Sequence, residues 1–114
     1  MNQAMSEARL QQENRAYRGS GGISEENRSF GFRPAFLDTE TDRIYASRFA
    51  DGRPAPFHLL DGLPEELVLA RHPGGRVAAV KASIISGFVR FGRFYTRDEA
   101  ARQASPEPAC LAFA

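Results

Sequence analysis

Cysteine, tryptophan and long apolar runs are what this sequence has least of. Among its 114 residues there is one cysteine and no tryptophan. A lone Cys110 can form neither an internal disulfide nor a zinc site of several thiolates, so we expect a reducing compartment. No stretch approaches the roughly 18 consecutive apolar residues of a membrane span, and residues 1–10 lack the apolar centre of a signal peptide. These absences predict a cytoplasmic protein without a membrane partner.

Recognisable catalytic arrangements are also missing. The two histidines, His58 and His72, have neither a nucleophile elbow nor a metal-ligand partner beside them in sequence, although Asp61 follows His58 closely. General acid–base work needs an imidazole near a carboxylate in a pocket, and covalent work adds a nucleophile. We therefore predict no catalytic residue, and a small enzyme of unidentified type is only the third hypothesis.

Metal and phosphate motifs fail on spacing. Residues 38–42 carry acids at alternate positions, but an EF-hand loop starting there needs glycine sixth and glutamate twelfth, where the chain has Arg43 and Phe49. The glycines at 19–22 and 74–75 lack the P-loop spacing and its following lysine. The sequence predicts no metal, no cofactor and no small-molecule substrate, and a polar hairpin turn at 38–42.

The net charge of +1 conceals a segregation of charge. From Asp38 to Glu66 seven acids outnumber three arginines, a balance of −4, whereas from Arg71 to Arg97 there are six bases and no acid. Such neighbouring blocks either meet a partner each or attract one another within one fold. The second explanation is favoured.

The stretch from Gly87 to Ala104 specifies its structure most clearly. Aromatic and β-branched residues on both sides of Gly92 predict a tight hairpin. Thr96 and Glu99 then stand at capping-box spacing, which predicts a helix from Arg97 to Gln103 with a cap worth about 1 kcal/mol. Ser105-Pro106 ends that helix, because the residue before proline avoids the α region.

The remaining pattern predicts one domain over residues 23–105, of length and composition usual for a globular protein. Further hairpins are expected around the turns at 38–42 and 72–75. Residues 77–88 also fit one face of a helix, but their β-branched side chains favour a strand. The predicted fold is α+β: a small antiparallel sheet of two or three hairpins with one short C-terminal helix packed on it.

Core positions follow from this arrangement. Phe30 and Phe32 are expected to plug the edge of the domain. The predicted core consists of the apolar residues Phe36, Ile44, Leu67, Leu69, Val80, Ile84, Phe88 and Phe94, and Phe94→Ala is expected to be severely destabilising.

Outside the domain we predict an N-terminal arm and a C-terminal tail. The arm covers residues 1–22: residues 1–18 hold good helix formers but a thin apolar stripe, and residues 19–22 form a linker. A flexible or weakly helical arm is favoured over a helix docked on the body or on a partner. Residues 106–114 are expected to form the tail.

The basic aromatic segment 88–97 is the strongest candidate contact site. Its arginines alternate with rings, the mixture with which single-strand binders hold phosphates and stack bases. The same pattern fits an aromatic core with a solvated arginine rim, which is the favoured explanation. Candidate contact residues for nucleic acid or a partner are Arg76, Lys81, Arg90, Arg93 and Arg97.

The segments GFVRFGRFYTRDEAA and RPAFLDTETDRIYASRFADGRPAP resemble small uncharacterised bacterial proteins, including ones of phage and mobile-element origin. This resemblance implies a small accessory protein and brings no catalytic residue with it. The leading hypothesis is a non-enzymatic protein-interaction or accessory module, self-associating through an unpaired hairpin edge. The alternative is nucleic-acid binding through the hairpin 88–97.

Overall fold

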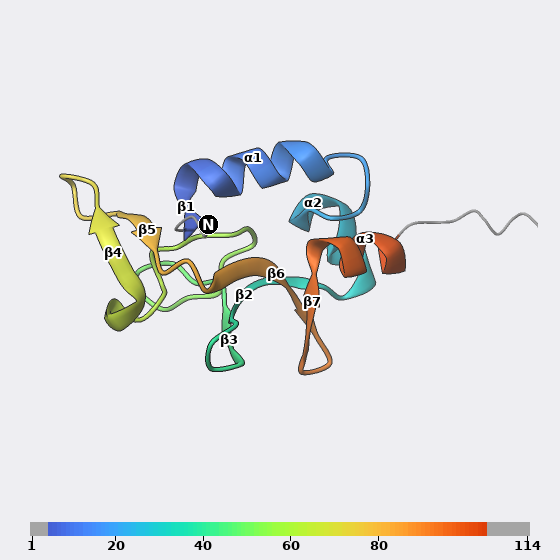
Figure 1. Ribbon diagram of the computed structural model, residues 1–114. Coiled ribbons are helices and arrows are strands. Elements are labelled where there is room, and N and C mark those ends of the chain that lie inside the picture. The colour runs from blue at the N-terminus through green and yellow to red at the C-terminus, as the bar shows by residue number, and fades with distance from the viewer. Residues whose placement is uncertain (1–4, 105–114) are drawn as a thin grey trace, which may run out of the picture.

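The computed structural model describes residues 5–104, which form two antiparallel sheets and three α-helices (Figure 1). The strands are β1 (Met5–Ser6), β2 (Arg33–Asp38), β3 (Arg43–Ala46), β4 (Val68–Arg71), β5 (Val77–Val80), β6 (Ile84–Arg90) and β7 (Arg93–Thr96). The helices are α1 (Glu7–Tyr17), α2 (Ser24–Asn27) and α3 (Arg97–Ala104), with 3₁₀ turns η1 (Arg28–Phe30) and η2 (Glu65–Leu67). The predicted α+β class is confirmed.

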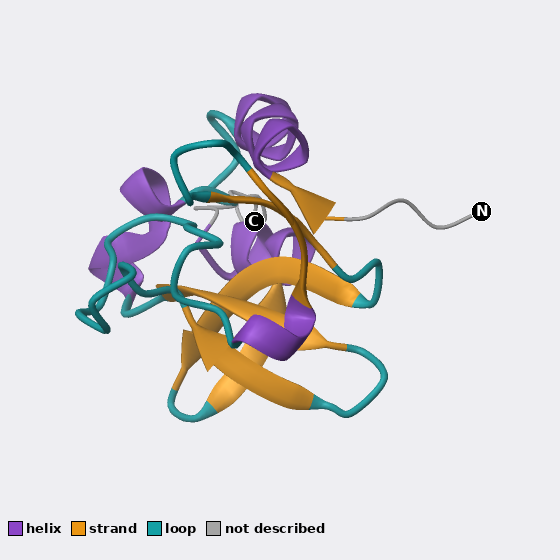
Figure 2. Cartoon of the chain, turned by 90° about the vertical axis from the view of Figure 1, so that its left-hand side faces the viewer, coloured by secondary structure: helices purple, strands orange, loops and turns teal. Residues whose placement is uncertain are grey.

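The larger sheet has the strand order β3-β2-β6-β7 and the smaller one β1-β5-β4. Residues 77–88 contribute two strands, β5 and the first part of β6, separated by a turn, so the strand interpretation is confirmed. Figure 2 views α1 end-on, with the strands of the larger sheet below it. The short strand β1 forms one edge of the smaller sheet, where Met5 pairs with Val80 of β5.

The aromatic hairpin and its following helix are formed as predicted. The turn between β6 and β7 consists of Phe91 (φ 55°) and Gly92 (φ 76°), and two successive positive φ values are typical of a type I′ hairpin. The Glu99 N–H donates to Thr96 Oγ1 at 3.1 Å and the Thr96 N–H donates to Glu99 Oε1 at 2.9 Å. This reciprocal capping box starts α3 directly after the hairpin.

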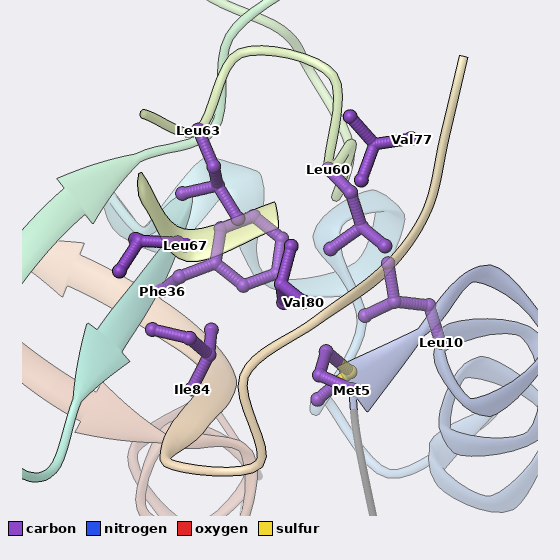
Figure 3. Close-up of a cluster of buried hydrophobic side chains, with 9 residues drawn as sticks. All are labelled: Met5, Leu10, Phe36, Leu60, Leu63, Leu67, Val77, Val80 and Ile84. Carbon is purple, nitrogen blue, oxygen red and sulfur yellow. The ribbon is translucent and has the colours of Figure 1, made fainter. Parts of the chain in front are cut away.

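Two clusters of buried side chains form the core. The larger lies between α1, the smaller sheet and one face of the larger sheet, and Figure 3 draws its nine members: Met5, Leu10, Phe36, Leu60, Leu63, Leu67, Val77, Val80 and Ile84. The smaller cluster joins Ala100 of α3 to Phe32 and Phe88. Every helix that contributes to the core therefore packs on the same face of the larger sheet as Phe36 and Phe88.

Three predicted core positions are wrong, and Phe30 is also exposed. Ile44 is 40% exposed and Leu69 is 61% exposed, because they lie on the edge strands β3 and β4. Phe94 is half-buried and belongs to neither core cluster. Phe32 is buried as expected, but Phe30 is 46% exposed.

The N-terminal segment differs from the predicted flexible arm. Ser6 caps α1 by accepting the Arg9 N–H at 3.1 Å, and Leu10 inserts into the larger core cluster. The thin stripe suffices because Met5 adds a buried side chain and a β-pairing just before the helix. Residues 1–4, the helix stop at 105–106 and the predicted tail 106–114 with Cys110 lie outside the described residues.

Candidate functional site: a sheet face and a hairpin tip

Two of the predicted contact cations are neutralised within the fold. Arg76 Nη2 lies 2.6 Å from Glu7 Oε2, and its Nε lies 3.5 Å from Asp61 Oδ2. Lys81 Nζ lies 2.8 Å from Glu40 Oε1, which raises the pKa of the lysine. Surface pairs of this kind contribute about 0–1 kcal/mol each. They agree with the interpretation that the acidic and basic blocks attract each other within one fold.

Arg97, predicted to be an accessible contact residue, is instead 3% exposed. Its Nε donates to Ser86 Oγ at 3.0 Å and lies 3.3 Å from Glu13 Oε1. Its Nη1 donates to Gly22 O at 2.9 Å, and its Nη2 lies 3.3 Å from His58 Nδ1. Desolvation lowers the pKa of Arg97, and the Glu13 carboxylate opposes that shift. The Arg97 guanidinium links α1 to α3 and is not accessible to a binding partner.

His58 belongs to the same buried network. Its Nε2 lies 2.6 Å from Gly87 O, and a carbonyl can only accept, so Nε2 carries the proton and Nδ1 accepts from Arg97. Burial, aided by the charge of Arg97, lowers the pKa of His58 to about 3. Both ring nitrogens are thus engaged in holding the sheet to α3.

The other residues of the catalytic hypothesis lie elsewhere. His72 is exposed, with Nε2 3.1 Å from Glu7 Oε1. Asp61 accepts the Val77 N–H at 3.0 Å. The fold does not bring the two histidines and Asp61 together into one site.

Arg90 and Arg93 remain at the β6–β7 hairpin, on either side of its turn. The Arg90 guanidinium lies 4.2 Å from the ring centroid of Phe32, and that of Arg93 lies 5.0 Å from the ring centroid of Tyr95. Neither guanidinium has an acidic partner among residues 5–104. Between them Phe91 is 93% exposed. The hairpin tip therefore presents the bare ring of Phe91 and the exposed cation of Arg93, whereas Arg90 is half-buried and donates to Phe30 O and Gln103 Oε1 at 3.3 Å each.

Phe91 also has a backbone conformation that few such residues adopt. Positive φ is strained for a bulky side chain, typically by about 1–3 kcal/mol, and asparagine or glycine is the usual choice. A ring that is both strained and solvent-exposed contributes little to the core. This combination marks the tip as a candidate contact site.

The second candidate is the face of the larger sheet that the helices leave uncovered. Strand register places ten residues on this face: Arg33, Ala35, Leu37, Ile44, Ala46, Ile85, Gly87, Val89, Phe94 and Thr96. Arg33 is the only charged residue in that set. We call the five large apolar members, Leu37, Ile44, Ile85, Val89 and Phe94, the open face.

The open face lies opposite the core. Leu37, Ile85, Val89 and Phe94 are half-buried and Ile44 is exposed, whereas Phe36 and Phe88, which point the other way, are fully buried. Figure 1 shows the helices on one side of the sheet, while the β2–β3 and β6–β7 hairpins extend to the other. An apolar sheet face of this kind is typical of a surface that another protein covers.

The Phe94 ring lies across the open face at Gly87. A Cβ at Gly87 would lie 2.4 Å from Phe94 Cζ and 2.3 Å from Tyr95 O, so only glycine fits there. The ring contacts β6 at Gly87, and part of Phe94 remains open to solvent. The sequence reasoning missed this face, although its signal is present: β6 is apolar on both sides, in the segment IISGFV.

Comparisons with known proteins add no relative: no family model matches the chain, and neither a curated protein nor a solved structure matches it. Within residues 5–104 there is no group of three or more potential metal ligands. None of the helices in that same part of the chain has the length and apolarity needed to cross a membrane. The functional argument therefore rests on the geometry of the chain itself.

Proposed function

We propose that this chain is a non-enzymatic protein-interaction module, an accessory protein of the cytoplasm, which associates with a second copy of itself through the open face. The observation that carries the proposal is the set of five large apolar side chains on a sheet face that none of the helices within residues 5–104 covers. Soluble monomers rarely leave such a contiguous apolar surface in water.

A second copy suits this face because its five large side chains are apolar and carry no charge. In a two-fold dimer the same patch meets itself, so any charge would meet its like. The five residues of the open face carry none, the single cation on that side of the sheet, Arg33, lies at one end beside Val89, and the net charge of the chain is only +1. Two such sheets would pack about 10 Å apart with their side chains interdigitated. The outer edges of β3 and β7, unpaired among the described residues, border the face and offer strand pairing in addition.

Light scattering after size-exclusion chromatography, over a wide range of protein concentration, tests the proposal. We expect a dimer, and we expect Ile44→Glu and Val89→Glu to give monomers, because each places an unpaired charge in the contact. The matched control is Leu69→Glu, which changes an even more exposed apolar residue on the smaller sheet. Leu69→Glu should leave the dimer intact.

Two outcomes would contradict self-association through the open face. One is a wild-type chain that is monomeric at every concentration. The other is a dimer that both open-face variants retain. Thermal unfolding of each variant, measured in dilute solution, should remain cooperative, since both substituted side chains are accessible in the monomer.

A second candidate function, nucleic-acid binding through the hairpin 88–97, rests on the exposed ring of Phe91 between Arg90 and Arg93. Stacking of a base on an aromatic ring contributes about 1–3 kcal/mol, and the flanking guanidinium groups suit phosphates. Arg97 takes no part, because it is buried.

Fluorescence anisotropy with single-stranded and duplex oligonucleotides tests this candidate. Binding at low salt should weaken steeply as the salt concentration rises. Phe91→Ala should weaken binding to single strands, whereas Phe57→Ala, which removes an exposed ring elsewhere, should not. No binding at about 50 mM salt would eliminate this candidate.

A further inference from the structure

A groove runs along the segment 54–58, between the strands β2 and β3 and the short helical segments α2 and η1. It consists of two hollows, of about 360 and 310 Å³, that share Arg28 and Pro56 in their linings. Arg28 Nη2 donates to Pro56 O at 3.3 Å, which holds the guanidinium where the hollows meet. The groove has two compartments with one cation between them.

The first hollow is apolar over most of its lining. Its walls include Gly31, Phe32, Pro34, Ala46, Pro54 and Ala55, and Arg33 also lines it. Phe32 and Ala55 are buried, while the two prolines differ: Pro54 is exposed and Pro34 is buried. No acidic residue lines this hollow. Its chemistry fits an aliphatic or aromatic side chain.

The second hollow is rich in hydrogen-bond donors. Asn14, Arg18, Ser24 and Arg28 all line it, against one carboxylate, Glu25. Neither arginine has an acidic partner in the described part of the chain. The excess of cationic donors over acceptors fits an anionic group.

Ser24 supplies an independent observation. The residue is 8% exposed, and its Oγ has no hydrogen-bond partner among the described residues. A buried hydroxyl without a partner is unfavourable, and such a group in a native fold calls for an explanation. The Oγ itself is buried behind the lining of the second hollow, and a rotation of the Ser24 side chain toward the hollow would let it donate to an acceptor bound there.

We propose that this groove binds an extended acidic segment of a partner protein. An apolar side chain of that segment fills the first hollow, and a carboxylate one to three residues further on accepts from Arg28 and Ser24 in the second. Arg18 adds positive charge beside the carboxylate, and the exposed ring of Phe57 borders it. An extended chain suits the groove because the two compartments differ in chemistry and adjoin at Arg28.

The groove is separate from the open face in the residues that carry the argument. Only Arg33 and Ala46, at the margin of the first hollow, belong to the same side of the sheet. Val89 of the open face lines neither hollow, although it pairs with Arg33 across β2 and β6. The proposal therefore holds whether or not the chain forms a dimer.

Fluorescence anisotropy with short labelled peptides tests the proposal. The probes carry one leucine followed by one glutamate at a spacing of one, two or three residues, and each has a glutamine-matched control. At one spacing or more, the glutamate peptide should bind the full chain about tenfold more tightly than its control, a difference of about 1.4 kcal/mol. Equal binding of both members of every pair, or no saturable binding, would overturn the proposal.

Two variants locate the site. Arg28→Gln should weaken the glutamate peptide about tenfold and leave the glutamine control unchanged. Ser24→Ala should lower the affinity for the same peptide severalfold. The thermal unfolding midpoint of this variant should stay equal to that of the wild type or rise, since the variant removes an unpartnered buried hydroxyl. The matched control is Arg43→Gln on β3, outside both hollows. Full affinity in both Arg28→Gln and Ser24→Ala would overturn the assignment.

Competition with acetate, and peptide binding by the Val89→Glu variant, test whether the peptide occupies both hollows of the groove. Acetate that displaces the labelled peptide as effectively as the unlabelled peptide would overturn the role of the first hollow. Val89→Glu should retain peptide binding even where it abolishes the dimer, and loss of peptide binding in that variant would place the peptide on the open face instead.

Discussion

Glu13 of α1 lies 3.3 Å from the buried guanidinium of Arg97 at the start of α3. The same carboxylate accepts from Ser86 Oγ at 2.5 Å, so one side chain near the N-terminus joins a helix start and a central strand. Because Arg97 is 3% exposed, its charge depends on this partner. The pair fixes α1 on the body through charge as well as through Leu10 and Met5.

Glu13→Ala should lower the free energy of unfolding by about 2–3 kcal/mol, somewhat less than a fully buried pair, because the Glu13 side chain is 25% exposed. Urea denaturation measures the loss. Glu66→Ala, an exposed acid in η2 without an ion pair in the described chain, should change stability by less than about 0.5 kcal/mol. Equal stability of the two variants would mean that water, not Glu13, compensates Arg97.

His58 should make the protein acid-sensitive. The unfolded chain takes up a proton on this ring as the pH falls through 6.5, whereas the folded chain does so only at about pH 3. Between these values the unfolded state binds more protons, so the unfolding free energy should fall by about 1.4 kcal/mol per pH unit as the solution is acidified.

Denaturation curves at several pH values measure this slope. His58→Gln should flatten it, while His72→Gln, on the exposed histidine, should not. Acids such as Asp38, whose pKa is lowered chiefly by the Glu40 backbone N–H, contribute to the slope in all three proteins, and the difference isolates His58. A His58 resonance that titrates near pH 6 in the folded protein would contradict the prediction.

Phe88 and Phe94, two of the three phenylalanines in the β6–β7 hairpin, should differ sharply in their contribution to stability. Phe88 is fully buried, and Phe88→Ala should lower stability by about 3–5 kcal/mol. Phe94 is half-buried on the open face, and Phe94→Ala should lower it by only about 1–2 kcal/mol, contrary to the severe effect predicted from sequence. Chemical denaturation in dilute solution decides, and equal losses would mean that Phe94 belongs to the core.

Phe91→Asn should raise stability by about 1 kcal/mol, since asparagine accepts the positive φ that the type I′ turn requires. Thermal unfolding measures the gain. The same variant should weaken any nucleic-acid binding through the hairpin tip. A decrease in stability would show that the ring makes contacts that outweigh its backbone strain.

Local signals in the sequence were sufficient for the hairpin and for α3. Gly92 and the spacing of Thr96 to Glu99 act within a few residues, so their geometry follows from chemistry that the sequence displays directly. The same holds for the strand assignment of residues 77–88, where β-branched side chains outweigh a coincidental helical spacing.

Long-range relationships were not predictable in this way. Nothing near Arg97 in sequence indicates burial, because its partners Glu13, Gly22 and His58 come from distant parts of the chain. An arginine within an aromatic segment is usually solvated, and that expectation failed here. The docking of α1 was the less favoured alternative for the same reason, since Leu10 finds its contacts on strands far along the chain.

A second limit on prediction from the sequence concerns the burial of residues on edge strands. Ile44 and Leu69 fit the apolar pattern of their strands, but whether an apolar face is covered depends on the layers around it. Of the candidate contact residues, Arg90 and Arg93 are placed together at the hairpin, whereas Arg76 and Lys81 pair with Asp61 and Glu40 of the acidic block. The distribution of charge along the sequence favoured attraction between the two blocks, but it could not show which acid pairs with which base.

The network around Arg97 also has a consequence for synthesis on the ribosome. The first helix emerges early, yet the guanidinium that matches Glu13 and the carbonyl of Gly22 arrives only after every strand of the larger sheet has been translated. Until then the Glu13 carboxylate lacks the cation with which it pairs. We therefore expect closure of the structure to be a late step of folding, and the interval before it to be the one in which a chaperone has most to protect.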